Sequence, residues 1–164
     1  MYTPAWLTKR KQFRAINDFL ATAAVANSER YTSNTYTFTK IGTCPLQNIQ
    51  TVMARHLQCG VKDQVILTHL EPWDVKLFTF NPRFPDNHET DTVWFHASPN
   101  EWTGNMSPKA HLLHLLSDFF GNTSPIVYHM LVTTEAYYAC SYEDYLFYDP
   151  SSSTLYHLGF RIDD

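Results

Sequence analysis

Two strand-like runs near the end of the chain, residues 145–149 and 155–160, are separated only by the turn Pro150-Ser151-Ser152-Ser153. So short a link predicts an antiparallel hairpin, because parallel neighbours need a crossover of about a dozen residues or more. The other strand-like runs are also short and closely spaced, at residues 34–41, 64–70, 75–81, 92–97, 126–132 and 136–141. This pattern favours a mostly antiparallel sheet.

Three segments carry apolar residues at the spacing of an amphipathic helix. The first runs from Thr3-Pro4 to about Ala24, the second from Cys44-Pro45 to Gly60, and the third from Ser107-Pro108 to Gly121. Their inward stripes predict a core that includes Trp6, Phe13, Ile16, Leu20, Leu46, Ile49, Leu112, Leu115, Leu116 and Phe119. We therefore expect an α+β fold, one domain over residues 1–164, with about three helices packed on one face of the sheet.

The composition supports a packed core and bounds the location of the protein. Aromatic residues make up 15% of the chain and hydrophobic residues 44%, so large rings can supply the buried area. Apolar runs reach only a few residues, whereas a transmembrane helix needs about 20. The basic N-terminal segment has no apolar stretch typical of a secretory signal. Three scattered cysteines without a CxxC motif indicate a reducing compartment, and we expect a cytoplasmic protein.

Several residues could support catalysis or metal binding. His111, His114 and Asp118 share one side of the third helix, but no strong zinc motif accompanies them, so a solvated stripe is favoured and no metal is expected. Cys44 stands at a helix start, where a thiol pKa falls. The five glycines form no phosphate-binding loop, and no cofactor is expected. A small hydrolase that uses a Cys or His residue in a cleft near the third helix is therefore the alternative function.

Charge is distributed unevenly along the chain. Lys9, Arg10, Lys11 and Arg14 form a basic group in the first helix, which is more typical of a solvated face than of a nucleic-acid site in a protein of pI 6.0. Acidic and tyrosine residues gather near the end of the chain, and the loop at residues 86–91 is a second acidic patch. Such a mixture can attract and anchor a basic protein. The alternative is that alternate tyrosines face the core and the acids only solubilise the sheet.

The leading interpretation is a non-enzymatic binding protein. A small, acidic, aromatic-rich α+β chain is similar in general type to many bacterial immunity proteins and phage-type inhibitors, although no motif supports that resemblance. It implies a protein that occludes a basic partner, such as a nuclease toxin. The residues expected to form the partner-binding acidic surface are Asp86, Glu89, Asp91, Tyr138, Tyr142, Glu143, Asp144, Tyr145 and Asp149.

Overall fold

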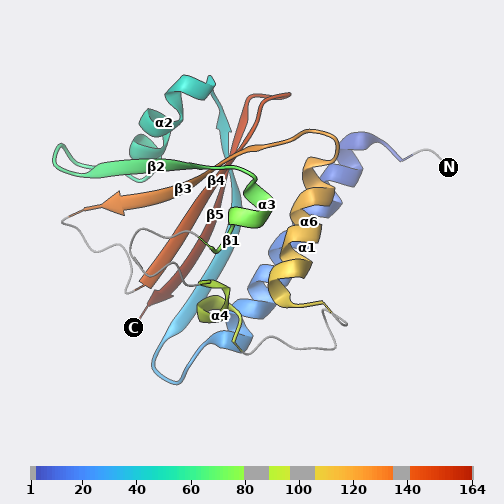
Figure 1. The fold of residues 1–164 in the computed structure, drawn as a ribbon, viewed down its shortest axis with the longest axis vertical. Coiled ribbons are helices and arrows are strands. Elements are labelled where there is room, and N and C mark those ends of the chain that lie inside the picture. Colours follow the sequence, from blue (N-terminus) through green and yellow to red (C-terminus); the bar gives the residue numbers. More distant parts are fainter. Residues whose placement is uncertain (1–2, 80–88, 97–105, 135–140, 164) are drawn as a thin grey trace.

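The centre of the protein is a five-stranded antiparallel sheet (Figure 1). The computed structural model describes residues 3–79, 89–96, 106–134 and 141–163. The strand order is β1-β5-β4-β3-β2, with every neighbouring pair antiparallel. The strands are β1 (Ser33–Thr43), β2 (Gln64–Leu70), β3 (Ile126–Thr133), β4 (Ser141–Asp149) and β5 (Thr154–Asp163). The expected α+β class and the antiparallel sheet are confirmed.

The predicted C-terminal hairpin forms the middle of the sheet. β4 pairs with β5 from Asp149↔Thr154 to Ser141↔Ile162, so the turn at residues 150–153 closes the hairpin as expected. β5 then pairs on its other side with β1. Because β5 has neighbours on both edges, its residues from Thr154 to Phe160 are buried. The last segment of the chain is thus one of its most buried parts.

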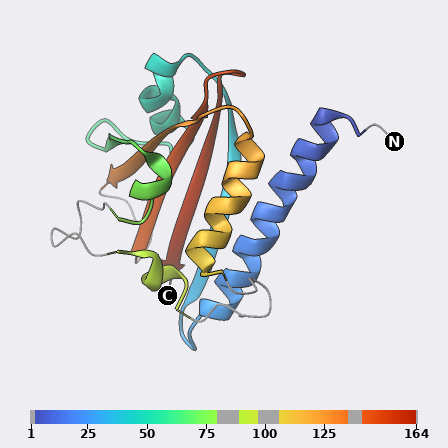
Figure 2. The ribbon, with the colours of Figure 1, turned by 45° about the vertical axis from the view of Figure 1, so that its right-hand side comes forward.

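Helices cover both faces of this sheet. The helices are α1 (Ala5–Asn27), α2 (Ile49–His56), α3 (Trp73–Lys76), α4 (Asp91–Trp94) and α6 (Pro108–Phe120), and a 3₁₀ turn (Leu46–Asn48) precedes α2. α1 and α6 lie side by side against one face (Figure 2), while α2 packs on the other. The expectation that all helices share one face is wrong for α2. Apolar side chains project from both faces of β3 and β4, so each face needs a cover.

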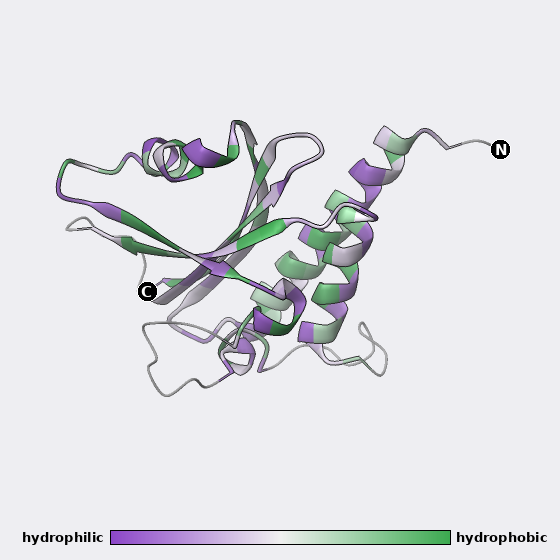
Figure 3. Cartoon of the chain, turned by 45° about the horizontal axis from the view of Figure 1, so that its top comes forward, coloured by the Kyte–Doolittle hydropathy of each residue, from purple (hydrophilic) through white to green (hydrophobic). Residues whose placement is uncertain are grey.

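The core consists of two clusters, one for each face of the sheet. The α1–α6 side contains Phe19, Leu20, Leu112 and Leu116 together with rings from the strands. The α2 side contains a smaller group around Met53. Colouring by hydropathy shows hydrophobic and hydrophilic residues alternating along the α1 ribbon (Figure 3), as expected for an amphipathic helix.

Two of the expected strands are wrong. Residues 75–79 belong to the single helical turn α3 and a following turn, and α4 occupies Asp91–Trp94 within the expected strand 92–97. The aromatic and β-branched residues of these segments suggested strands. In the structure, Phe78 and Trp94 are instead buried in the core cluster on the α1–α6 side of the sheet. The expected strand at 136–141 falls outside the described residues except for Ser141.

None of the described helices combines the length and the apolar character that crossing a bilayer requires. The extent of the domain, residues 1–164, stays a prediction.

Candidate binding sites

The carboxylates expected to form an exposed acidic surface are mostly buried. Glu143, Asp144 and Asp149 have exposed fractions of 1%, 0% and 1%, and Tyr145 is fully buried. The expectation that these four side chains face solvent is wrong, because the hairpin that carries them lies in the middle of the sheet. Buried carboxylates must be hydrogen-bonded or paired. Each of the three has such a structural role.

Glu143 belongs to a buried polar network on the α1–α6 face. Its Oε2 accepts hydrogen bonds from the hydroxyl of Tyr145 at 2.6 Å and from that of Thr90 at 2.8 Å. The Tyr145 hydroxyl in turn accepts the backbone N–H of Phe78 at 3.0 Å. Burial, followed by the Glu143 charge, raises the pKa of Tyr145, so the phenol stays protonated and donates. The network fastens the Phe78 backbone and the Thr90 side chain to β4.

Asp144 points to the opposite face and pairs with a histidine. Its Oδ1 lies 2.7 Å from Nε2 of His157 on the neighbouring strand, and both side chains are buried. Gly159 makes room for the pair, because a Cβ there would lie 3.2 Å from the same carboxylate oxygen. The pairing satisfies two polar groups that the sheet removes from water.

Asp149 organises the β4–β5 turn. Its Oδ1 accepts the backbone N–H of Ser151 at 2.9 Å and the hydroxyl of the same residue at 2.7 Å, while Oδ2 lies 3.5 Å from Nζ of Lys9. Burial by itself raises the pKa of this carboxyl, but the Ser151 hydrogen bonds and the Lys9 charge together outweigh burial, and the pKa is lowered. The residue is therefore charged and structural.

The rest of the expected surface is small. Glu89 is exposed, while Asp91 and Tyr142 are partly exposed, and the Tyr142 hydroxyl donates to the carbonyl of Val132 at 2.7 Å. Asp86 and Tyr138 lie outside the described residues. The hydrogen bond from Thr90 to Glu143 does bring the two acidic segments together. Without the three buried carboxylates, the chain has thirteen acidic residues for twelve Lys and Arg residues, so most of its net charge of −4 comes from the interior.

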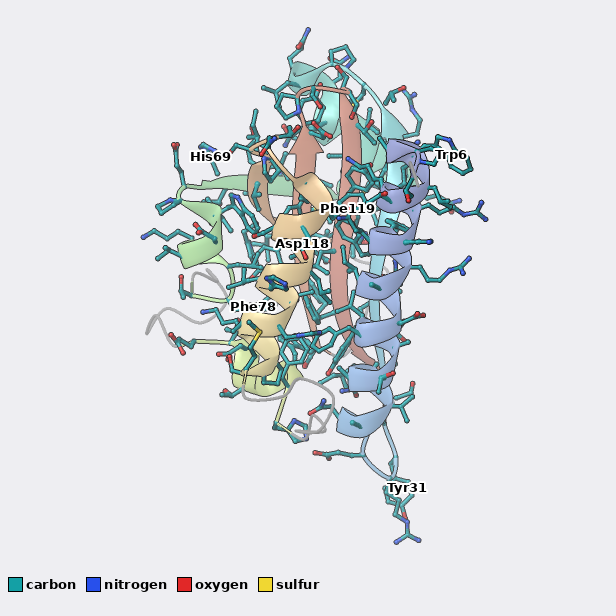
Figure 4. All side chains as sticks on the ribbon, turned by 90° about the vertical axis from the view of Figure 1, so that its right-hand side faces the viewer. Trp6, Tyr31, His69, Phe78, Asp118 and Phe119 are labelled. Atoms are coloured by element: carbon teal, nitrogen blue, oxygen red, sulfur yellow. The ribbon has the colours of Figure 1, made fainter. Side chains whose placement is uncertain are left out.

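The two histidines of α6 lie in different surroundings. His114 Nε2 lies 3.4 Å from Asp118 Oδ2, and each side chain is more than half exposed; Asp118 lies on the face of α6 turned toward the viewer in Figure 4. The ring of His111 packs 4.9 Å from that of Phe19, and burial, followed by the charge of His114, lowers its pKa. Among the described residues, no group of three possible metal ligands is present.

The two described cysteines are free thiols with low intrinsic reactivity. Burial raises the pKa of Cys44, and burial followed by the charge of Asp63 raises that of Cys59. A raised pKa decreases the thiolate fraction that would act as a nucleophile. Catalytic use of Cys44 at the helix start therefore gains no support. Cys140 lies outside the described residues.

A groove at the end of β2 combines carboxylates with aromatic rings. We call it the β2–α3 groove; its volume is about 630 Å³, and it is lined by Leu46, His69, Leu70, Glu71, Pro72, Trp73, Asp74, Ser124, Pro125, Ile126 and Tyr128. Glu71 and Asp74 are exposed, and Trp73 and Tyr128 are partly exposed. The rings of His69 and Tyr128 lie 5.4 Å apart. No Lys or Arg is among the described residues of this lining.

Sequence reasoning missed this groove because its residues come from separate segments. Glu71-Pro72-Trp73-Asp74 separates the expected strands 64–70 and 75–81, so the sequence indicated only a short, hairpin-like link. Only the pairing of β2 with β3, which sets His69 opposite Tyr128, brings the second aromatic residue beside it. The pattern of an acid, an aromatic and another acid within four residues was the available signal.

The fold and this groove define an α+β protein with a five-stranded antiparallel sheet, helices on both faces and a concave surface at the β2 edge of the sheet. No protein-family model matches the chain, and no curated protein matches it in sequence. Among solved structures, the chain is similar to a crystal structure of citrus MAF1, with a TM-score of 0.52 and 11% identity. The match covers 93% of this chain and 98% of that chain. At this identity the likeness is one of fold alone.

Proposed function

We propose that this chain is a non-enzymatic binding protein that occludes a basic protein partner, with the β2–α3 groove as the contact site. The observation that carries the proposal is the position of the exposed carboxylates of Glu71 and Asp74 beside Trp73 and Tyr128 in one concave surface. Both features favour binding of a Lys or Arg side chain, because carboxylates form ion pairs with its charge and the faces of aromatic rings attract cations.

The biological form that best fits this chemistry is an immunity protein or a phage-type inhibitor acting in the cytoplasm. Nucleases hold phosphate with basic surfaces, so an inhibitor with an acidic, aromatic contact site would cover such a surface directly. The free thiols of Cys44 and Cys59 are compatible with a reducing compartment.

The hydrolase alternative gains no comparable support. A groove of about 250 Å³ lies beside the end of α6, where the alternative expected its cleft. Its described lining includes Ser117 and Asp74 but neither a Cys nor a His. The raised thiol pKa values of Cys44 and Cys59 also disfavour nucleophilic catalysis.

The contact site can be tested with a fluorescein-labelled peptide rich in Arg and Lys, measured by anisotropy. We expect binding that weakens with salt and falls by about tenfold or more in the double variant Glu71→Gln/Asp74→Asn. The matched control, Asp18→Asn/Glu29→Gln, changes two exposed acids of the α1 segment and should bind like the unmodified protein. Equal losses in both variants would contradict the proposed site.

The mode of action needs a purified natural partner, obtained by capture from the native host. An inhibitor that occludes its partner reaches full effect at about one equivalent of inhibitor per partner molecule. An enzyme that inactivates its partner does so at far smaller amounts. Complete loss of partner activity at a small fraction of an equivalent would contradict occlusion and favour the hydrolase.

A further inference from the structure

A second groove, with the opposite charge, lies at the N-terminal half of α1. We call it the α1 groove; its volume is about 380 Å³, and it is lined by Trp6, Lys9, Arg10, Phe13, Lys40, Phe119 and Tyr156. Three of these seven residues are cations and four are aromatic. No described residue of the lining is acidic.

The floor of the α1 groove is a packed group of rings. The ring centroid of Phe13 lies 5.9 Å from that of Phe119 and 6.5 Å from that of Tyr156, and Phe119 and Tyr156 are 5.2 Å apart. These contacts join α1, α6 and β5. Because rings held by several neighbours lose little entropy on binding, the floor is a preformed apolar surface.

Trp6 continues this apolar surface into solvent. It belongs to the stripe that predicted a core face for α1, and its expected burial is wrong: 66% of the residue is exposed. The first turns of α1 extend past the neighbouring helix, where nothing described covers them (Figure 4). Large aromatic residues exposed beside a groove are typical of binding sites.

Cations surround the apolar floor. Lys9 is held in place, with Nζ 4.5 Å above the Phe119 ring and 3.5 Å from Asp149. Arg10, Lys11 and Lys40 are exposed, and no described carboxylate forms an ion pair with them. Their charges are therefore available to a ligand.

We infer that the α1 groove binds an acidic peptide segment of another protein, with an apolar side chain on the aromatic floor and carboxylates against Arg10 and Lys40. An apolar anchor explains the exposed Trp6 and the ring floor, and charge complementarity explains the cationic rim. A nucleic acid would use the cations but needs a longer basic track for its phosphates. The observations therefore favour an acidic peptide.

This inference is independent of the proposed function. The α1 groove lies at the β1 side of the sheet and the β2–α3 groove at the β2 side, and these strands form opposite edges of the sheet. Trp6 and His69 mark the two sides in Figure 4. A basic partner at one groove would leave the other groove open, so either site can fail without the other.

The test measures a fluorescein-labelled peptide of Glu and Asp residues around a central Leu-Phe pair, by anisotropy over a salt series. Arg10→Glu/Lys40→Glu should weaken binding by about tenfold or more at low salt, with a smaller loss at high salt. Trp6→Ala should also weaken binding about tenfold, but with little dependence of that loss on salt. The matched control Arg55→Glu/Lys62→Glu reverses two exposed cations elsewhere and should bind normally.

Three results would overturn the inference. The first is equal binding by Arg10→Glu/Lys40→Glu and its control. The second is tighter binding of a labelled single-stranded oligonucleotide than of the acidic peptide, which would assign the groove to nucleic acid. The third is a dimer in analytical ultracentrifugation that Trp6→Ala dissociates, which would assign the groove to a second copy of the chain. Circular dichroism of each variant verifies folding.

Discussion

Replacing Tyr145 with phenylalanine removes a single oxygen atom from the interior and keeps the buried ring. That oxygen donates to Glu143 Oε2 at 2.6 Å and accepts the backbone N–H of Phe78 at 3.0 Å. The variant leaves the Phe78 N–H without this acceptor, and Glu143 keeps the Thr90 hydroxyl as a donor. The change therefore tests whether the buried carboxylate is a structural group.

The expected cost follows from the two lost hydrogen bonds. A buried N–H without an acceptor costs about 1–3 kcal/mol, and a lost donor to a charged group about 1.5–3 kcal/mol. No cavity larger than one hydroxyl is created, so the Tyr145→Phe variant should lose about 2.5–6 kcal/mol in the free energy of unfolding. Against a total stability of about 5–15 kcal/mol, this is a large fraction.

Urea unfolding followed by circular dichroism measures this loss. The matched control is Tyr31→Phe, because Tyr31 is 77% exposed and its substitution should change the free energy of unfolding by less than about 0.5 kcal/mol. If Tyr145→Phe is as stable as this control, the polar network does not stabilise the fold.

Two further predictions concern the pH dependence of stability. The pKa of Asp149 is lowered by the Ser151 hydrogen bonds and the Lys9 charge against the effect of burial, so its contribution is complete above the unfolded pKa of about 3.9 and is lost as the pH falls. Urea titrations at decreasing pH should therefore show a smaller acid destabilisation for Asp149→Asn, and an unchanged acid profile would contradict this. Burial raises the pKa of Tyr36 to about 12, with a smaller opposing effect of Asn34, so stability should fall between about pH 10 and 12, where the unfolded phenol ionises first. Tyr36→Phe should flatten that alkaline decrease, and an unchanged slope would assign it to other groups.

Local signals in the sequence identified α6 well, because its N-terminal cap and its apolar stripe agree. For α6, the Ser107 hydroxyl accepts the backbone N–H of Ala110 at 3.1 Å, and Leu112, Leu116 and Phe119 are buried as expected. The same stripe rule failed at Trp6. An apolar stripe specifies which side of a helix faces inward. The length of the neighbouring elements decides how far along the helix that side is buried.

The acidic residues show why the expected binding surface was wrong. In the sequence, Glu143, Asp144 and Asp149 have no basic residue nearby, which suggested exposed and unpaired charges. Glu143 and Asp149 each have one partner two residues away, Tyr145 and Ser151. The other partners of these carboxylates are distant in the chain: Thr90, His157 and Lys9. Hydrogen bonds across such separations leave no local pattern, so a buried carboxylate and a solvent-exposed one look the same in the sequence.

By itself, the sequence determined the C-terminal hairpin, the antiparallel sheet and the three longer helices, because each depends on periodicity, caps and turns within a few residues. The tertiary structure alone decided that α2 covers the second face, that the hairpin lies in the middle of the sheet, and that two oppositely charged grooves lie at its edges. The physical reason is the order of the strands. Because β5 lies between β1 and β4, the hairpin is in the interior of the sheet and its carboxylates are buried. The two edge strands and the segments that flank them supply residues of the β2–α3 groove and the α1 groove.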